Sequence, residues 1–340
     1  MNTSFPQELE RLKPKIWRVL SSYLPQNPHK FAKIVADYPN RQGQYLRPGL
    51  LLLTYQMLRK QDSKAMLSSA ALQISHEWLL IHDDVEDGAT IRRGRPSLNK
   101  IHGNPLAVNA GDSLHLIMWR ILLDNLQVLG PLLGQKVNYK IQDILFTTTL
   151  GQFQELNWIQ SKTFDISLRD YFQMIDKKTG YYTVTGPIQL GAILAKNNNL
   201  LPLISKFGQP WGRAFQIQND IANIENIKSG QTNDIVEGKR SLLFLHTFGQ
   251  STLEERRRIK QIYIKESHEK TQAEVEFILH LIKKYRGMAY AQTVAQKMAK
   301  QTRLELTIPK IKALLEALEY TISPNEPIPW SKDSALSLTL

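Results

Sequence analysis

The sequence predicts an all-α protein built as one large helical bundle, and three observations carry that prediction. Apolar residues recur at intervals of three and four, alternating strand patterns are absent, and Pro/Gly clusters separate the periodic segments. The helical period runs through residues 63–87, 112–128, 136–158, 168–195, 202–226, 253–263 and 271–301. No repeat or linker divides the 340 residues. We therefore expect one helical domain over residues 1–322 and a C-terminal tail over 323–340.

Composition excludes several kinds of site. Hydrophobic residues make up 42% of the chain and charged residues 22%, which is ordinary for a globular protein. The absence of cysteine excludes disulfides, thiolate metal ligands and cysteine nucleophiles. No segment has the roughly 18 apolar residues that a membrane span needs, and the first residues do not resemble a signal peptide. We expect a cytoplasmic location and no membrane span.

The net charge of +12, from 43 basic and 31 acidic residues, is compatible with several anionic partners. Nucleic acid, an anionic membrane surface, anionic small substrates and a merely solvated basic surface would all fit such an excess. The basic runs at 254–260 and 281–286 mix signs or alternate with apolar residues, as exposed helix faces do. No nucleic-acid motif accompanies them, so we expect no nucleic-acid partner.

The densest cluster of chemistry lies at residues 83–87, where DDVED contains three aspartates. On a helix Asp83 and Asp87 are four residues apart, so their carboxylates share a face about 6 Å apart, with Asp84 beside them. Like charges at that spacing destabilise an isolated helix, so a compensating cation is expected. Oxygen ligands of this kind suit Mg²⁺. The alternative is a solvated acidic helix end.

The neighbouring sequence favours the metal site. Residues 74–82, ISHEWLLIH, are mostly apolar, which indicates that the acids end a buried helix. Downstream, Arg92, Arg93 and Arg95 surround a Gly-Pro turn, and arginine is suited to forked recognition of phosphate. A metal-binding acidic cluster facing guanidinium groups therefore predicts a diphosphate site.

The run HDDVEDGATIRRGRP (82–96) resembles the first aspartate-rich motif of the polyprenyl synthetase family, the trans-prenyl diphosphate synthases. Further matches follow in the order of that family, over roughly residues 40–250. They are YLRPGL (45–50), NAGDSL (109–114), GQFQEL (151–156), MIDKKTGYYT (174–183), FQIQNDIAN (215–223) and DIVEGKRSLLFLH (234–246).

The resemblance implies a helical bundle of the isoprenoid synthase type around a central cavity. Two acidic motifs would face each other across its mouth and hold three Mg²⁺ on an allylic prenyl diphosphate. Ionisation would give an allylic carbocation, which isopentenyl diphosphate attacks, and the released diphosphate would take the proton. The resemblance also implies a homodimer.

The resemblance assigns residues to four roles. The implied metal ligands are Asp83, Asp84, Asp87, Asn219, Asp220 and Asn223. The allylic diphosphate would contact Arg92, Lys178, Thr179, Gln216 and Lys239. Isopentenyl diphosphate would contact Gln44, Arg47, His76 and Arg93. The implied catalytic set is Asp83, Asp84, Asp87, Lys178 and Asp220.

Two positions depart from the family pattern. Gln44 stands where the family has a phosphate-binding lysine, and it brings hydrogen bonds without charge. Asn219 replaces the first aspartate of the second acidic motif, and its neutral oxygen should hold Mg²⁺ more weakly than a carboxylate. The basic residue expected after that motif is displaced, with Lys228 as a candidate for its role.

These departures leave three hypotheses open. The chain is an ordinary chain-elongating synthase, or a terpene cyclase or prenyltransferase that uses another acceptor. The third is a weakly active partner subunit of a heteromeric synthase. The intact first motif argues against the third hypothesis, because a purely regulatory subunit has no need of it.

Two residues upstream of Asp83 have a second interpretation as core residues. Trp78 and Leu79 stand five and four positions before Asp83, where the family places the residues that block the growing chain. They predict a C15 to C20 product, although Trp78 could also simply pack the core. His76 lies two turns before Asp83 on the same face, which fits a phosphate-facing group as well as a satisfied core histidine.

Overall fold

Helices form nearly the whole of the computed structural model, which describes residues 4–26, 29–59, 63–225, 234–306 and 313–322. The first half contains α1 (Phe5–Tyr23), α2 (Lys30–Val35), α3 (Asp37–Arg41), α4 (Leu46–Arg59), α5 (Met66–Glu86), α6 (Leu98–His102), α7 (Asn104–Leu129) and α8 (Pro131–Gln160). The second half contains α9 (Leu168–Ile175), α10 (Gly186–Leu194), α11 (Leu201–Glu225), α12 (Asp234–Glu237), α13 (Leu242–Gln250), α14 (Leu253–Tyr263), α15 (Gln272–Lys284), α16 (Gly287–Glu305) and α17 (Leu314–Ile322). The all-α prediction is confirmed. The proposed tail, 323–340, lies outside the described residues.

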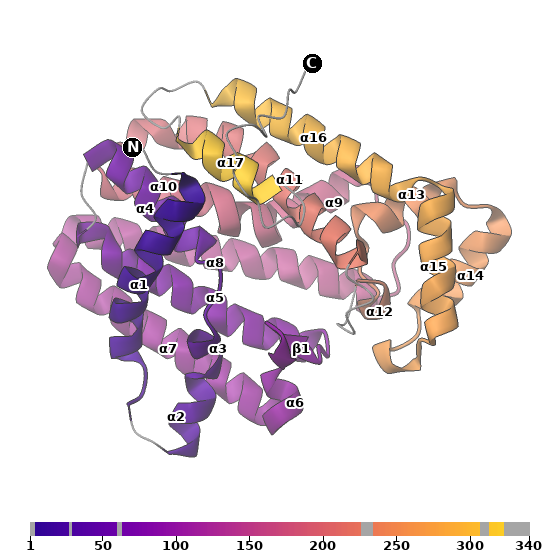
Figure 1. Cartoon of the computed structure of the whole chain (residues 1–340), viewed down its shortest axis with the longest axis horizontal. Helices are drawn as coiled ribbons and strands as arrows, with labels where there is room; N and C mark the ends of the chain where they lie inside the picture. Colours follow the sequence, from indigo (N-terminus) through magenta and orange to yellow (C-terminus); the bar gives the residue numbers. More distant parts are fainter. Residues whose placement is uncertain (1–3, 27–28, 60–62, 226–233, 307–312, 323–340) are drawn as a thin grey trace.

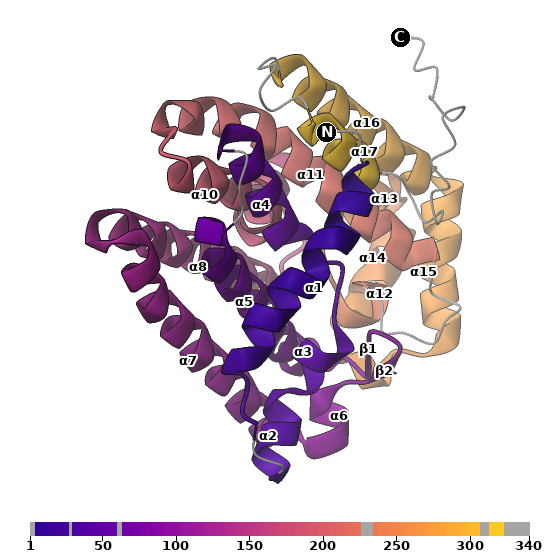
Figure 2. The same ribbon diagram turned by 60° about the vertical axis from the view of Figure 1, so that its left-hand side comes forward.

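The bundle is arranged around α5. This helix packs along α7 and against α1 and α4, while α11 packs along α16 (Figure 1). Helices α12 to α15 form a lobe at the right of Figure 1, and α1 crosses the front of the bundle in Figure 2. Between α9 and α10 the chain forms a π-helical segment, Asp176–Thr185, which contacts both α8 and α11. The two acidic motifs lie near the C-terminal ends of α5 and α11.

Small residues let α5 occupy this central place. Its buried first turns include Ser68, Ser69, Ala70 and Ala71, which allow neighbouring helices to approach closely. The Ser69 hydroxyl donates to the carbonyl of Ala65 at 2.9 Å, so burial leaves this polar group satisfied. No helix among the described residues is long and apolar enough to cross a bilayer.

Two details differ from the pattern expected from sequence. The single helix expected over 271–301 is wrong, because Arg286 adopts a left-handed conformation (φ 55°) and separates α15 from α16. A short hairpin, β1 (Ile91–Arg92) with β2 (Arg95–Pro96), follows the acidic motif. Its turn has positive φ at Arg93 and Gly94, and two-residue strands are too short to show an alternating pattern. The hairpin folds the arginines back toward α5.

Candidate active site

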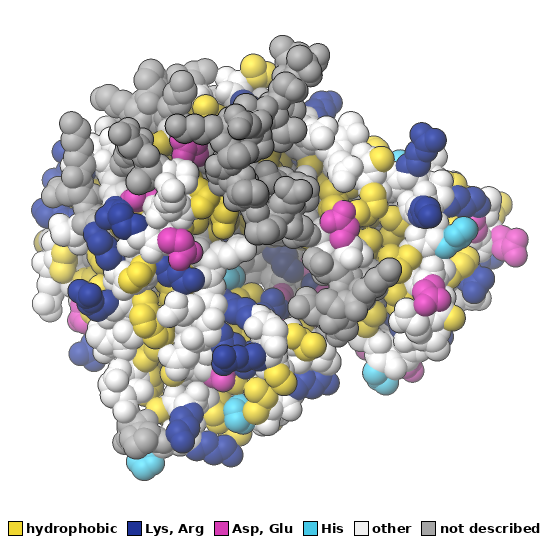
Figure 3. All heavy atoms as spheres, viewed as in Figure 1, with side chains coloured by type: hydrophobic (Ala, Val, Ile, Leu, Met, Phe, Trp, Pro, Cys, Tyr) yellow, Lys and Arg dark blue, Asp and Glu magenta, His cyan; other side chains and the backbone are white. Residues whose placement is uncertain are grey.

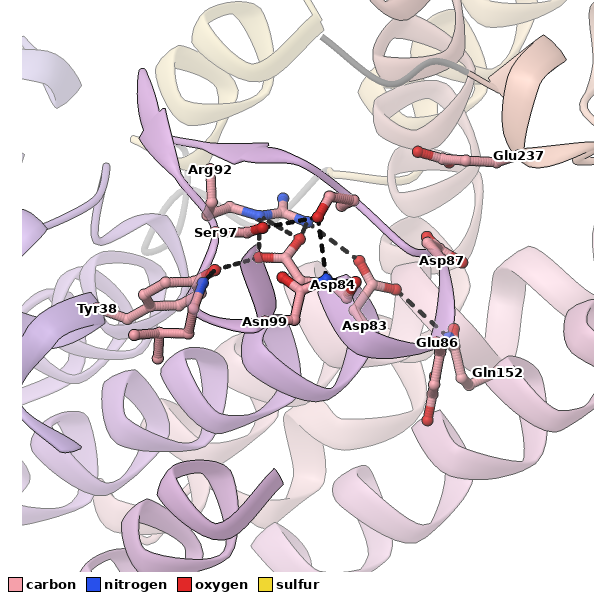
Figure 4. Close-up of polar contacts among 12 residues, drawn as sticks. Tyr38, Asp83, Asp84, Glu86, Asp87, Arg92, Ser97, Asn99, Gln152 and Glu237 are labelled. Atoms are coloured by element: carbon pink, nitrogen blue, oxygen red, sulfur yellow. Dashed lines mark hydrogen bonds and ion pairs between the residues drawn. The ribbon is translucent and has the colours of Figure 1, made fainter. Parts of the chain in front are cut away.

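The last turn of α5 presents two carboxylates with different partners (Figure 4). Asp84 is only 1% exposed and accepts hydrogen bonds from the Tyr38 hydroxyl and from Arg92, whose Nε lies 2.9 Å from Oδ1. Asp83 Oδ2 lies 3.4 Å from Arg92 Nη2, and its Oδ1 lies 3.3 Å from Gln152 Nε2. Asp83 also lines the central cavity. Asp84 is therefore held by protein partners, whereas Asp83 is open to a ligand.

Asp87 closes the first acidic motif and pairs with a lysine from the other side of the cavity. Lys239 Nζ lies 2.8 Å from Asp87 Oδ2 and 2.6 Å from Glu237 Oε2. Burial raises the pKa of Asp87 to about 7, against the attraction of Lys239. Burial alone would lower the pKa of Lys239, but Asp87 and Glu237 raise it well above its ordinary value. This ion pair links the end of α5 to the segment after α12.

Lys178 reaches the same carboxylates from the π-helical segment. Its Nζ forms an ion pair with Glu155 of α8 and lies 4.0 Å from Asp83 Oδ1. Gly151 makes this approach possible, because a Cβ there would meet the backbone nitrogen of Lys178 at 2.3 Å. Burial would raise the pKa of Asp83, but Lys178, Lys239 and Arg92 together lower it below its ordinary value. The site therefore keeps Asp83 ionised.

The second acidic motif, at the end of α11, contains one carboxylate and two amides. Asp220 accepts hydrogen bonds from the Tyr171 hydroxyl at 3.0 Å and from Gln216 Nε2 at 2.7 Å. Burial raises the pKa of Asp220 to about 6. The Asn223 side-chain oxygen accepts the backbone N–H of Asp234 at 2.9 Å, so it caps α12. Asn219 lines the cavity with Asp220 and Asn223, and Lys228 lies outside the described residues.

A third group of side chains lines the polar part of the cavity. It consists of Gln44, Arg47, His76 and Arg93. The Arg47 guanidinium lies 4.3 Å above the Tyr182 ring, and its Nε has no hydrogen-bond partner among the described residues. Burial, with Arg47 and Arg93 nearby, lowers the pKa of His76 well below its ordinary value, so the imidazole is neutral. Gln44 is exposed at the rim of the same cavity. The structure therefore brings these four positions together.

The cavity has two connected parts. A polar part of about 750 Å³ reaches both acidic motifs and the arginines, and a more apolar part of about 400 Å³ extends along α5 and α8. Both parts are lined by Arg47, His76, Leu80, Asp83 and Thr179. In Figure 3 the surface is hollowed between the α12 to α15 lobe and the rest of the molecule, with basic and acidic side chains inside the hollow.

Aromatic and imidazole rings lie along the apolar part. Trp78 and Leu79 line it, as do His82 and Phe153. The Trp78 ring is 4.9 Å from the ring of His115, which accepts a hydrogen bond from Trp119 Nε1 at 3.0 Å. Trp78 therefore packs against other rings and also bounds the cavity, so its side chain is compatible with both interpretations made from the sequence.

Several residues of the site were missed by sequence reasoning. Glu155 and Gln152 lie within GQFQEL, three residues apart on α8, and that spacing was the available signal. Asp234 begins DIVEGK and lines the polar part of the cavity. Glu77, which binds Arg93, and Tyr38, which binds Asp84, had no signal in the sequence.

Comparisons with known proteins identify the family of the chain. The polyprenyl synthetase family model matches residues 28–282. The chain is 30% identical over 321 residues to a geranylgeranyl diphosphate synthase from Sulfolobus acidocaldarius, covering 89% of this chain and 94% of that protein. It is also 30% identical over 293 residues to a nonaprenyl diphosphate synthase from Mycobacterium tuberculosis, covering 84% of both.

A solved structure shares the fold. The geranylgeranyl pyrophosphate synthase from Corynebacterium glutamicum, complexed with isoprenyl diphosphate and magnesium, superposes with a TM-score of 0.83. The match covers 95% of this chain and 100% of that one, at 17% identity. The chain belongs to the polyprenyl synthetase family and is therefore a trans-prenyltransferase.

Proposed function

We propose that the protein condenses an allylic prenyl diphosphate with isopentenyl diphosphate to give a C15 to C20 prenyl diphosphate. The observation that carries this proposal is one cavity with two kinds of lining. Its polar part gathers Asp83, Asp220, Arg92 and Arg47, and its apolar part has room for a prenyl chain. The relatives are named for products of different length, so we infer the C15 to C20 limit from Trp78 and Leu79, which line the apolar part of the cavity.

Among the described residues, no three Asp, Glu or His side chains form a ready metal site, so divalent metal binding would rest on carboxylates of the two motifs completed by diphosphate oxygens and water. Asp83 and Asp87 offer oxygens within a buried and strongly charged site, which suits Mg²⁺. Asp220 supplies the carboxylate of the second motif, with Asn219 beside it, and we propose three Mg²⁺ in all. Bound Mg²⁺ would neutralise charge on the diphosphate leaving group. Asp84 would then act by holding Arg92 rather than as a ligand.

The lysines and Arg92 would bind the allylic diphosphate. Without substrate, Lys178 is paired with Glu155, and Lys239 with Asp87 and Glu237. These ion pairs hold both ammonium groups beside the first acidic motif, and binding would exchange their carboxylate partners for diphosphate oxygens. Thr179 and Gln216 also line this part and would donate hydrogen bonds.

The reaction would follow from this placement. The allylic C–O bond breaks, the electron pair leaves with the diphosphate, and the C4 carbon of isopentenyl diphosphate forms the new C–C bond. The C2 proton of the acceptor passes to the released diphosphate. Arg47, His76 and Arg93, with Gln44, would hold the acceptor diphosphate, and the apolar lining would keep water from the carbocation.

We also propose that the protein is a homodimer formed through α7 and α8. Exposed apolar side chains repeat at seven-residue spacing along both helices, which are neighbours in the bundle. They are Leu132, Tyr139, Phe146 and Phe153 on α8, and Leu116 and Leu123 on α7. A second copy would cover this stripe in the manner of a coiled-coil seam. Light scattering should give a dimer mass, and Phe146→Glu should give a monomer; a monomeric wild type would refute the interface.

A second candidate function is transfer of the prenyl group to another acceptor, or cyclisation. Gln44 favours it, because the acceptor side lacks the cation that the family has there. The third possibility, a weakly active partner subunit, would also account for Asn219. The cytoplasmic location remains a prediction from the sequence.

One assay separates these functions. The purified protein would be incubated with Mg²⁺ and dimethylallyl, geranyl, farnesyl or geranylgeranyl diphosphate, with and without isopentenyl diphosphate. Longer diphosphates that require isopentenyl diphosphate would support the proposed synthase. Diphosphate release with hydrocarbon or alcohol products, independent of isopentenyl diphosphate, would overturn it in favour of the second function. No turnover by the chain alone would favour a partner subunit.

A further inference from the structure

A buried carboxylate lies beside the cations of the proposed acceptor site. Glu77 is 1% exposed, and it accepts two hydrogen bonds from Arg93, with Nη1 at 3.0 Å and Nη2 at 3.2 Å. Gln73, one turn earlier on α5, donates to Glu77 Oε1 at 2.6 Å. The remaining Arg93 contact shown is to the carbonyl of Tyr38 at 3.0 Å. Most of the hydrogen bonding of this arginine is therefore directed at Glu77 and the protein backbone.

Glu77 also acts on the other arginine of the site. Its charge attracts Arg47 as well as Arg93, and it is in direct contact with Arg93 alone of the two. Arg47 has no direct bond to it and stacks on Tyr182 instead. The acceptor side thus has two arginines, one buried anion, a neutral His76 and an uncharged Gln44. The formal charge available for a second diphosphate is small compared with that of the substrate.

We propose that Glu77 is a positioning residue that limits the positive charge of the acceptor site and thereby sets a low affinity for isopentenyl diphosphate. It holds Arg93 in place through a two-point ion pair, and it weakens the attraction that Arg93 and Arg47 exert on an incoming diphosphate. This inference rests on the proposed function, because it concerns the acceptor of that reaction. It extends the function by naming a residue that does not line the cavity.

The test compares two buried carboxylates that pair with arginine. Glu77→Gln removes the charge while keeping the shape, and Glu8→Gln is the matched control. Glu8 is also buried and bound to an arginine, Arg11, but lies on α1 away from the cavity. Both variants are expected to lose some stability, since each removes a buried charge that pairs with an arginine, but only Glu77→Gln should also change substrate binding.

Steady-state kinetics would distinguish an effect of the Glu77 charge from a purely structural role of this residue. We expect Glu77→Gln to lower KM for isopentenyl diphosphate about tenfold, as removal of a unit charge several ångströms away permits. KM for the allylic substrate and kcat should stay within about twofold, and Glu8→Gln should change neither KM. A purely structural role would raise KM for isopentenyl diphosphate or lower kcat instead. An unchanged or higher KM in folded Glu77→Gln would overturn the proposal.

Two further measurements cover the cases in which the protein shows no turnover or Glu77→Gln does not fold. Calorimetric titration of isopentenyl diphosphate, with inorganic diphosphate and Mg²⁺ present, reports binding without turnover. If the wild type binds isopentenyl diphosphate but never elongates, the proposed function fails while Glu77 can still be judged by binding. If Glu77→Gln does not fold, Gln44→Lys adds a cation at the exposed rim of the same site. That variant should tighten binding about tenfold, and unchanged binding would overturn the charge limit.

Discussion

The two acidic motifs face the same cavity but differ in charge. At the end of α5, Asp83 and Asp87 are both carboxylates, and the cations around them are supplied by three separate segments. At the end of α11, only Asp220 is a carboxylate, and it is satisfied by Tyr171 and Gln216. The first motif can therefore exchange its protein cations for metal ions. The carboxylate of the second motif already accepts hydrogen bonds from the protein.

This contrast predicts unequal roles in catalysis. The first motif would carry most of the divalent-metal affinity, and the second would contribute mainly when a diphosphate is bound. Each of the following variants tests a different part of that division.

The largest effect is expected from Asp83→Asn. The change removes the carboxylate that Lys178 and Arg92 both approach, so kcat/KM should fall on the order of a thousandfold, about 4 kcal/mol of transition-state stabilisation. Steady-state kinetics with Mg²⁺ would measure it. A loss of less than tenfold, with the fold intact by circular dichroism, would mean that the first motif does not dominate.

A gain is expected from Asn219→Asp. Restoring a carboxylate beside Asp220 should lower the Mg²⁺ concentration for half-maximal activity by about tenfold, because ligand charge tunes affinity for hard cations. Asn223→Asp is the matched control, since that side chain already accepts the Asp234 N–H and is engaged in capping. The interpretation of Asn219 as a weakened ligand fails if Asn219→Asp leaves the Mg²⁺ dependence unchanged, or if Asn223→Asp changes it equally.

Trp78, which lines the apolar part of the cavity, provides a variant that changes neither acidic motif. Trp78→Ala should lengthen the main product by about one isoprene unit, because the removed ring bounds the apolar part of the cavity. His115 contacts the Trp78 ring and binds Trp119, so these two rings should limit further growth of the product. Chromatography of the products would show the shift, and the Mg²⁺ dependence should not move. An unchanged product distribution would assign Trp78 to core packing alone.

Sequence patterns were sufficient for the fold class and for the composition of the mouth. Periodicity gave the helices because burial of one face imposes a 3.6-residue repeat. Most of the residues supplied by the resemblance line one cavity, whereas Asp84 is buried against Tyr38 and Arg92. Whether those residues bind substrate and metal as assigned stays a prediction. The break at Arg286 could not be predicted, since no glycine or proline marks that residue itself and the apolar repeat continues through it.

The partners of the charged groups were also beyond the sequence. Nothing local shows that Asp84 binds Tyr38, which is 46 positions away, or that Glu77 binds Arg93. Such pairs depend on how the hairpin folds back on α5, and a helical pattern contains no information on that approach. The sequence showed which residues are charged, but not which partners neutralise or hydrogen-bond them.

The effect furthest from catalysis concerns the pH dependence of stability and involves His76. Its native pKa lies well below the ordinary value, because of burial and then Arg47 and Arg93, so the folded protein keeps the imidazole neutral. The unfolded chain binds a proton there at about pH 6.5, so stability is full above that pH and is lost as pH falls. His76→Gln should therefore flatten the fall in unfolding free energy between about pH 6.5 and 5, by up to about 1.4 kcal/mol per pH unit. Urea denaturation at several pH values would measure both slopes, and equal slopes would show that His76 is protonated alike in both states.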